Sequence, residues 1–142
     1  MIPYTSRIPV ASSYLQAIGQ VVYNLATVEW NMVYLGSLVV PSFVSRAGGA
    51  AFEAVATDFS LLSEVGTHPD FKDLSAKFTD AVMRQEDLLR STPYTADEGV
   101  QQLGGAAGPW PEEKIWAFAK ELEDLDIAAN ALYYKLKTDA GD

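Results

Sequence analysis

The chain of 142 residues contains no cysteine and a single histidine, His68. Without cysteine, disulfide bonds, thiolate metal sites and a cysteine nucleophile are all excluded. The serines show no spacing that ties them to a base, and we interpret His68, which precedes a proline, as a capping or exposed loop residue. No segment has the spacing of a calcium loop or of a phosphate-binding Gly-Lys-Ser/Thr motif. The sequence therefore predicts neither a metal site nor a cofactor.

Basic residues are also few. Ten Lys and Arg stand against nineteen Asp and Glu, which gives a formal net charge of −9. A protein that binds nucleic acid without sequence preference needs Lys and Arg to displace counterions from the phosphates. We therefore expect no direct nucleic-acid binding. An acidic surface instead suits solubility, or docking onto a protein partner with a basic surface.

Long uninterrupted apolar runs are missing as well. Residues 14–40 are rich in apolar side chains, but polar residues interrupt them at Gln16, Gln20, Asn24, Glu29 and Asn31. A membrane-spanning helix needs about 20 consecutive, predominantly apolar residues. The first residues of the chain also lack the apolar stretch of a signal peptide. The sequence thus predicts a cytoplasmic protein that makes no membrane contact.

Four segments carry apolar residues at the three- and four-residue spacing of a helix. We expect helices near 13–41, 52–66, 70–90 and 111–137, with flexible ends at 1–11 and 138–142. Ser13 with Gln16 forms a candidate capping box at the start of the first helix. Glu112 and Glu113 follow Pro111 at the start of the last, where carboxylates suit the helix dipole. The predicted fold is one all-α domain over residues 1–142, a four-helix bundle.

The first predicted helix is apolar on two sides. One row consists of Leu15, Ile18, Val22, Leu25 and Met32, and a second row consists of Tyr14, Val21, Val28 and Leu35. A helix that is apolar on two sides has to be covered on two sides. Its own bundle provides one cover, and a second subunit would provide the other. We therefore expect a homodimer formed through this helix.

Residues 91–111 form one long connection that is rich in Gly and Pro. Loops of this length are often functional or mobile. Residues 100–103 have the pattern of a short strand or of one arm of a hairpin. Tyr94 and Trp110 lie in the same segment, where an exposed aromatic side chain would anchor an interface. The alternative is that the two rings fold back as lids on the core.

Two polar residues interrupt the apolar rows. Glu29 occupies an apolar position of the first predicted helix, and Gln85 does so in the third. Burying an unpaired carboxylate is costly, so Glu29 should have a partner or lie at a wet cleft. One interpretation is a site where the first and third predicted helices face each other. The other is that the first helix is slightly rotated and Glu29 reaches solvent.

Residues 18–22 and 26–30 resemble the opening helix of HEPN-like proteins, and residues 87–99, from Asp87-Leu88-Leu89 to Gly99, resemble a later part of that family. In bacterial members the stretch typically reads Arg-Asn-Asp-Leu-Leu-His, followed by an arm containing Pro and Gly. The closing helix after Trp110 also fits. The resemblance touches most of the chain, and its sharpest part is under fifteen residues long.

The resemblance implies a bundle of four, or up to five, helices that is usually dimeric. Many HEPN domains are metal-independent ribonucleases, in which an arginine and, four to six residues later, a histidine activate the ribose 2′-hydroxyl and stabilise the phosphate. An acidic residue on the first helix sometimes assists, and Glu29 would be its counterpart.

This chain differs from the family at the positions of the catalytic signature. Gln85 stands in place of the arginine, Glu86 in place of the asparagine and Arg90 in place of the histidine. A match shifted to Arg84 still ends on Arg90. Because arginine stays protonated at neutral pH, it cannot serve as a general base. The resemblance therefore implies a catalytically inactive member.

We predict a non-catalytic acidic binding protein that inhibits or regulates a bacterial nuclease, defence (anti-CRISPR-like) or toxin–antitoxin system. The alternative is a HEPN-type ribonuclease with an altered site made of Glu29, Arg84 and Arg90. An acidic run on the last helix is either a solvated face or a docking surface. The candidate binding residues are Glu29, Gln85, Glu86, Asp87, Arg90, Tyr94, Trp110, Glu121, Glu123, Asp124 and Asp126.

Overall fold

The computed structural model describes residues 10–40, 43, 52–65 and 68–139. Four α-helices lie in this part of the chain: α1 (Ser12–Ser37), α3 (Phe52–Val65), α4 (Asp70–Leu89) and α5 (Glu112–Asp139). Three strands, β1 (Thr92–Thr95), β2 (Gln101–Gly105) and β3 (Gly108–Trp110), lie between α4 and α5, and a short 3₁₀ helix (Asp97–Gly99) joins the first two strands. None of the helices in these residues has the length and apolar character that a membrane crossing needs.

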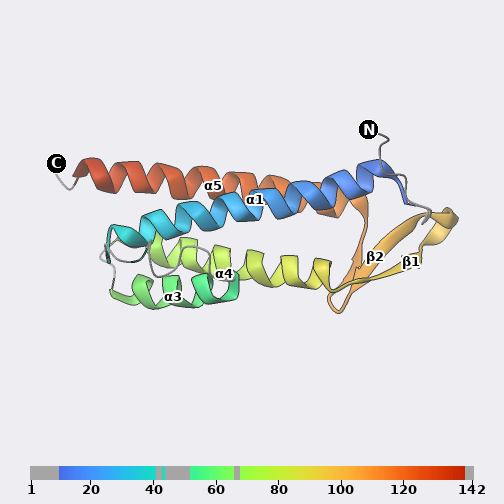
Figure 1. Cartoon of the computed structure of the whole chain (residues 1–142), viewed down its shortest axis with the longest axis horizontal. Coiled ribbons are helices and arrows are strands. Elements are labelled where there is room, and N and C mark those ends of the chain that lie inside the picture. Colours follow the sequence, from blue (N-terminus) through green and yellow to red (C-terminus); the bar gives the residue numbers. More distant parts are fainter. Residues whose placement is uncertain (1–9, 41–42, 44–51, 66–67, 140–142) are drawn as a thin grey trace, which may run out of the picture.

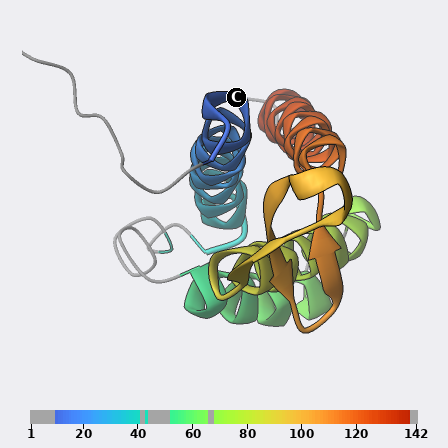
Figure 2. The ribbon, with the colours of Figure 1, turned by 90° about the vertical axis from the view of Figure 1, so that its right-hand side faces the viewer.

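The helices form two layers. α1 and α5 lie side by side and run in the same direction, and α3 and α4 lie beneath them (Figures 1 and 2). The shared direction is visible in the order of their polar contacts, since Ser13 bonds to Glu112 and Asn31 bonds to Asp126. α4 runs the opposite way, so the sheet sits at the end where α4 finishes and α1 and α5 begin (Figure 1).

The buried face of α1 is the second of the two predicted rows. Tyr14, Val21, Val28 and Leu35 are buried in the core, whereas Leu15 and Val22 of the first row are exposed. Leu25 and Met32, which also belong to the first predicted row, are buried, so the core takes part of that row as well. The sequence does not distinguish the two sides because Glu29 is the single charged residue of this helix.

The predicted capping box at the start of α1 was wrong. Ala11 is the N-cap residue and no side chain caps the first turn. The hydroxyl of Ser13 instead donates a hydrogen bond to the Glu112 carboxylate, 2.8 Å away, at the start of α5. At the other end of the chain, Thr138 and Asp139, which we expected to be flexible, belong to α5. Residues 1–9 and 140–142, also expected to be flexible, lie outside the described residues.

The prediction of an all-α fold was wrong, because residues 92–110 form a three-stranded antiparallel sheet. The strand order is β1-β2-β3, with Thr92 opposite Gly104 and Leu103 opposite Trp110. The residues that suggested a loop are the ones the turns need: Gly99 and Gly108 have φ angles of +77° and +125°. Such values favour glycine, so the Gly and Pro content reflects tight turns between short strands.

Tyr14 joins α1 to the sheet. Its buried hydroxyl donates a hydrogen bond to the Trp110 carbonyl oxygen at 2.5 Å and accepts one from the Leu103 backbone N–H at 2.8 Å. Burial raises the pKa of this hydroxyl, which therefore stays protonated and able to donate. One side chain thus satisfies a backbone group on β2 and another on β3, and fixes the sheet against the first turn of α1.

We expect the substitution Tyr14→Phe to lower the free energy of unfolding by about 1–3 kcal/mol, because it leaves a backbone N–H and a carbonyl without their partner. Urea unfolding followed by circular dichroism measures the change. Tyr23→Phe is the matched control, since Tyr23 lies on the same helix and is 71% exposed. Equal stability of the two variants would contradict this role of Tyr14.

Candidate functional site

Asp87, in the last turn of α4, holds the sheet from the other side. Its carboxylate accepts hydrogen bonds from the Trp110 indole N–H at 2.8 Å and from the Ala107 backbone N–H at 3.2 Å. The Trp110 hydrogen bond lowers the pKa of Asp87, an effect that burial partly opposes. The backbone of Gly105 lies so close to this carboxylate that a Cβ atom at position 105 would collide with it. Asp87 is therefore a hydrogen-bond acceptor with a structural role.

The substitution Asp87→Asn should lower the free energy of unfolding by about 1–3 kcal/mol at neutral pH, because it weakens hydrogen bonds to a charged acceptor. The folded-state pKa of Asp87 is lowered. The stabilisation that the ionised Asp87 provides is therefore complete above about pH 4, the ordinary pKa of aspartate. It disappears as the pH falls through the folded-state pKa. Urea titrations at several pH values should show the two proteins converging in acid.

The control for this prediction is Asp124→Asn, an exposed position in the middle of α5. Substitutions at such surface positions usually change stability by no more than about 0.5 kcal/mol. A difference between the native protein and Asp87→Asn that stays constant down to pH 2 would contradict the proposed charge dependence.

The side chains in the place of the nuclease signature do not form a reactive pair. Gln85 is 4% exposed, and its side-chain oxygen has no hydrogen-bond partner among the described residues. Glu86 and Arg90 form an ion pair at 2.8 Å, with Arg90 almost fully exposed at the end of α4. Neither Gln85 nor Arg90 is placed to abstract a proton from a substrate.

Glu29 is remote from Arg90. Arg90 directly precedes the sheet, at the end of the molecule where α1 begins (Figure 1). Glu29 lies seventeen residues into α1, which is about 25 Å along the helix from that end. Its half-buried carboxylate makes no hydrogen bond or ion pair with another described residue, and burial raises its pKa. Within a single chain, Glu29 and Arg90 therefore do not form a common site.

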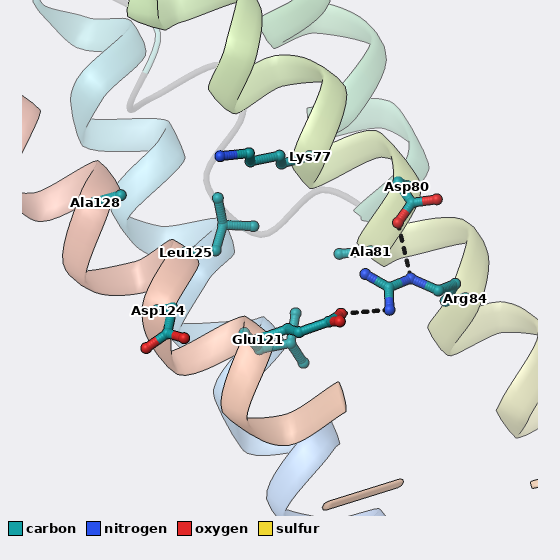
Figure 3. A pocket seen from close by; sticks show the side chains of 9 residues that line it. Lys77, Asp80, Ala81, Arg84, Glu121, Asp124, Leu125 and Ala128 are labelled. Atoms are coloured by element: carbon teal, nitrogen blue, oxygen red, sulfur yellow. Dashed lines mark hydrogen bonds and ion pairs between the residues drawn. The ribbon is translucent and has the colours of Figure 1, made fainter. Parts of the chain in front are cut away.

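Arg84 is held in a charged cleft between α4 and α5. Its guanidinium lies 2.8 Å from the Asp80 carboxylate and 2.5 Å from that of Glu121 (Figure 3). It also lies 4.5 Å from the centre of the Phe118 ring. The cleft encloses about 340 Å³. Lys77 also lines it and pairs with Asp73 on its own helix. A phosphate would have to displace two carboxylates to reach Arg84.

The acidic run of α5 does not form one face. Glu121 turns toward α4 and Arg84, whereas Asp126 accepts a hydrogen bond from Asn31 of α1. Glu123 and Asp124 pair with Lys120, at 3.5 and 3.2 Å. Residues three apart on a helix are neighbours, so Glu121 and Asp124 share the side that lines the cleft, and Glu123 and Asp126 lie on another side. The run therefore carries no single docking surface.

The two aromatic residues of the arm have different environments. Trp110 is 1% exposed and packs at 5.8 Å, between ring centres, against Phe118, so it is a lid on the core. Tyr94 on β1 is exposed, and its hydroxyl accepts a hydrogen bond from the Gln102 amide at 2.5 Å. Of the two, Tyr94 is the one that a partner could reach.

The sheet creates an acidic groove that the sequence did not reveal. The groove encloses about 660 Å³ between β1, β2 and the first turns of α1 and α5. Three carboxylates line it, those of Asp97, Glu112 and Glu113, and no Lys or Arg among the described residues does. Glu112 is bound to Ser13 and Trp116, whereas Asp97 and Glu113 make no bond with another described residue. Fifteen residues separate Asp97 from Glu112, and the fold of the sheet brings them together.

The three carboxylates of the groove are not arranged as a metal site. Within the described ranges, no group of three or more His, Asp or Glu side chains is placed to hold a metal ion. His68 bonds locally, since its Nδ1 accepts a hydrogen bond from the Asp70 backbone N–H at 3.2 Å at the start of α4.

Comparisons of this chain with known protein families, with curated proteins and with solved structures found no match. The resemblance to HEPN-like proteins therefore stays a prediction. The acidic groove and the paired state of Arg84 are the features on which a functional proposal can rest.

Proposed function

We propose that this protein is a non-catalytic acidic binding protein that acts by protein–protein contact in the cytoplasm. Its role would be to inhibit or regulate a bacterial nuclease, defence (anti-CRISPR-like) or toxin–antitoxin system by docking onto a basic surface. The observation that carries the proposal is the groove at the sheet end of the molecule, in which the described residues place three carboxylates and no Lys or Arg.

The groove combines charge with apolar contact. Asp97 and Glu113 are exposed and can accept hydrogen bonds from Lys or Arg, while Val100 and Tyr94, which also line the groove, are exposed apolar side chains. Lys and Arg bury their aliphatic stems on such side chains while the charged head pairs with a carboxylate, and Arg also stacks on tyrosine. The net charge of −9 would further increase the rate of encounter with a basic partner.

Catalysis is the rival function, and the contacts of its candidate residues argue against it. Arg84 is paired with two carboxylates, and Arg90 cannot act as a base. Burial raises the pKa of Glu29, but this residue lies far from Arg90 along the molecule. We therefore expect no cleavage of labelled RNA in the absence of metal, and no difference between the native protein and Arg90→Ala.

The groove is tested by neutralising its two unpaired carboxylates together, with Asp97→Asn and Glu113→Gln. We expect the immobilised native protein to capture a basic protein, at low salt, from lysate of the organism that encodes it. The double variant should retain at least about tenfold less of it, because both carboxylates would contact the partner. Raising the salt to about 1 M should release the partner from the native protein as well.

The matched control carries the same loss of charge elsewhere, with Asp73→Asn and Asp124→Asn. Both positions are exposed and lie outside the groove. If the control loses the partner as fully as the groove variant does, binding follows net charge alone and the groove is not the site. A partner retained unchanged at high salt would contradict acidic docking, and RNA cleavage abolished by Arg90→Ala would favour the rival function.

A further inference from the structure

A continuous cluster of aromatic rings lies on the surface where α1 and α5 meet. Trp30 contacts Tyr34 on α1, Tyr34 contacts Tyr133 across the two helices, and Tyr133 contacts Tyr134. The distances between ring centres are 5.2, 6.4 and 5.3 Å. Trp30 and Tyr134 are 47% and 59% exposed. Large rings in contact with one another and with solvent mark an interaction surface more often than a simple monomer surface.

The cluster continues along both helices. Tyr23 lies seven residues before Trp30, and Ile127 lies seven residues before Tyr134, so each pair shares one side of its helix. Both Tyr23 and Ile127 are strongly exposed. Together with the four rings of the cluster, they form a stripe that we call the aromatic face. No described element covers this side of the α1–α5 layer (Figure 2).

The aromatic face is nearly free of uncompensated charge. α1 contributes none, because its single charged residue is Glu29, which is half-buried. On α5, Lys120 is paired with both Glu123 and Asp124, which leaves one net negative charge, and the Lys137 ammonium lies over the Tyr133 ring at 5.7 Å. A basic partner would therefore find little to pair with here, unlike in the acidic groove.

The face is also large enough for a stable interface. The two helices have 26 and 28 residues. Each is therefore about 40 Å long and about 10 Å wide, and their shared outer surface is on the order of 800 Å². Stable protein–protein interfaces bury about 800 Å² on each partner.

The shape of α1 on this side suits a copy of itself. Large and small residues alternate along it in the order Gly19, Tyr23, Ala26, Trp30, and the space above Gly19 is open. When two such helices pack about a two-fold axis, the rings of one copy can lie over the small residues of the other. Each chain carries a net charge of −9, so two copies repel each other across most of their surfaces. That repulsion is weakest across the aromatic face.

We propose that two copies of this chain associate through the aromatic face, with α1 of one copy against α1 of the other. The acidic groove stays open in such a dimer, because it is lined by the sheet and by the first turns of α1 and α5, whereas the aromatic face begins at Tyr23, further along α1. The dimer would therefore present two grooves. The proposal does not depend on the proposed function, and either one can fail without the other.

Light scattering over a range of micromolar concentrations tests the dimer. The native protein should show a mass near twice the 15.4 kDa of one chain. Trp30→Glu should raise the dissociation constant by roughly a hundredfold, since a two-fold interface carries the added carboxylate twice. Leu61→Glu is the matched control, because Leu61 is an exposed apolar residue on α3, away from the aromatic face. Circular dichroism establishes that each variant is folded.

Salt and cross-linking give independent readouts. Raising the salt from about 0.05 to about 1 M should strengthen the dimer, because it screens the repulsion between two acidic chains, and should weaken docking of a basic protein in the groove. Since the native chain has no cysteine, Ala26→Cys and Leu61→Cys provide single thiols for a short bis-maleimide. Ala26→Cys should be cross-linked into a dimer and Leu61→Cys should not.

Three outcomes would overturn the proposal. The first is a native protein that stays monomeric at about 100 μM, a concentration at which interfaces of this size are normally occupied. The second is a dimer that Trp30→Glu leaves intact, which would place the interface elsewhere. The third is equal disruption by Trp30→Glu and Leu61→Glu, which would show that any added charge separates the copies.

Discussion

The hydrogen bond from the Trp110 indole to the Asp87 carboxylate is the interaction on which the sheet end of this molecule depends. Asp87 lies in the last turn of α4, and Trp110 lies two residues before α5. The carbonyl of the same tryptophan accepts the Tyr14 hydroxyl from α1. One residue thus links three helices, and the strands between them are held by that link. The Lys114 ammonium lies over the indole at 4.3 Å, so the ring is enclosed as well as bonded.

This arrangement changes what the family resemblance can mean. Asp87 belongs to the short segment that carries the resemblance most sharply, and here its carboxylate holds a turn and an indole of the same chain. The structural role of Asp87 is therefore sufficient to explain why an aspartate stands at this position, and no catalytic role is needed. Arg84, the nearest cation on α4, is likewise engaged by Asp80 and Glu121. Two unpaired carboxylates, those of Asp97 and Glu113, lie together in the groove, and the proposed binding function rests on them.

The helices could be predicted from the sequence because helical periodicity is a local property. The face of α1 that is buried could not, since both candidate rows are apolar and Glu29 is the helix's single charge. Of the sheet, the sequence indicated one short strand or hairpin arm, at residues 100–103. The other two strands were not predicted, because the strands have three to five residues each and their stability comes from Asp87 and Tyr14, which lie outside them. No spacing rule connects residues 14, 87 and 110.

The candidate site was even less accessible to sequence reasoning. Glu112 and Glu113 were recognised as residues that suit a helix start, and Asp97 had no assigned role. Their proximity follows from the turn between β1 and β2, which places Asp97 beside the start of α5. The acidic run of α5, by contrast, was visible in the sequence and is dispersed around the helix in the structure. Charge density along a chain is a poor guide to charge density on a surface when the residues are helical.

The central claim is that Asp87, Trp110 and Tyr14 hold the sheet as one unit. Amide hydrogen exchange tests it most directly at Leu103 and Ala107, whose N–H groups bond to the Tyr14 hydroxyl and the Asp87 carboxylate. The account predicts that both amides are protected in the native protein. It also predicts that both lose protection together when Asp87 is replaced by alanine, while amides in the middle of α1 are unaffected. Fast exchange at both amides in the native protein, or an unchanged Leu103 amide in the Asp87→Ala variant, would contradict it.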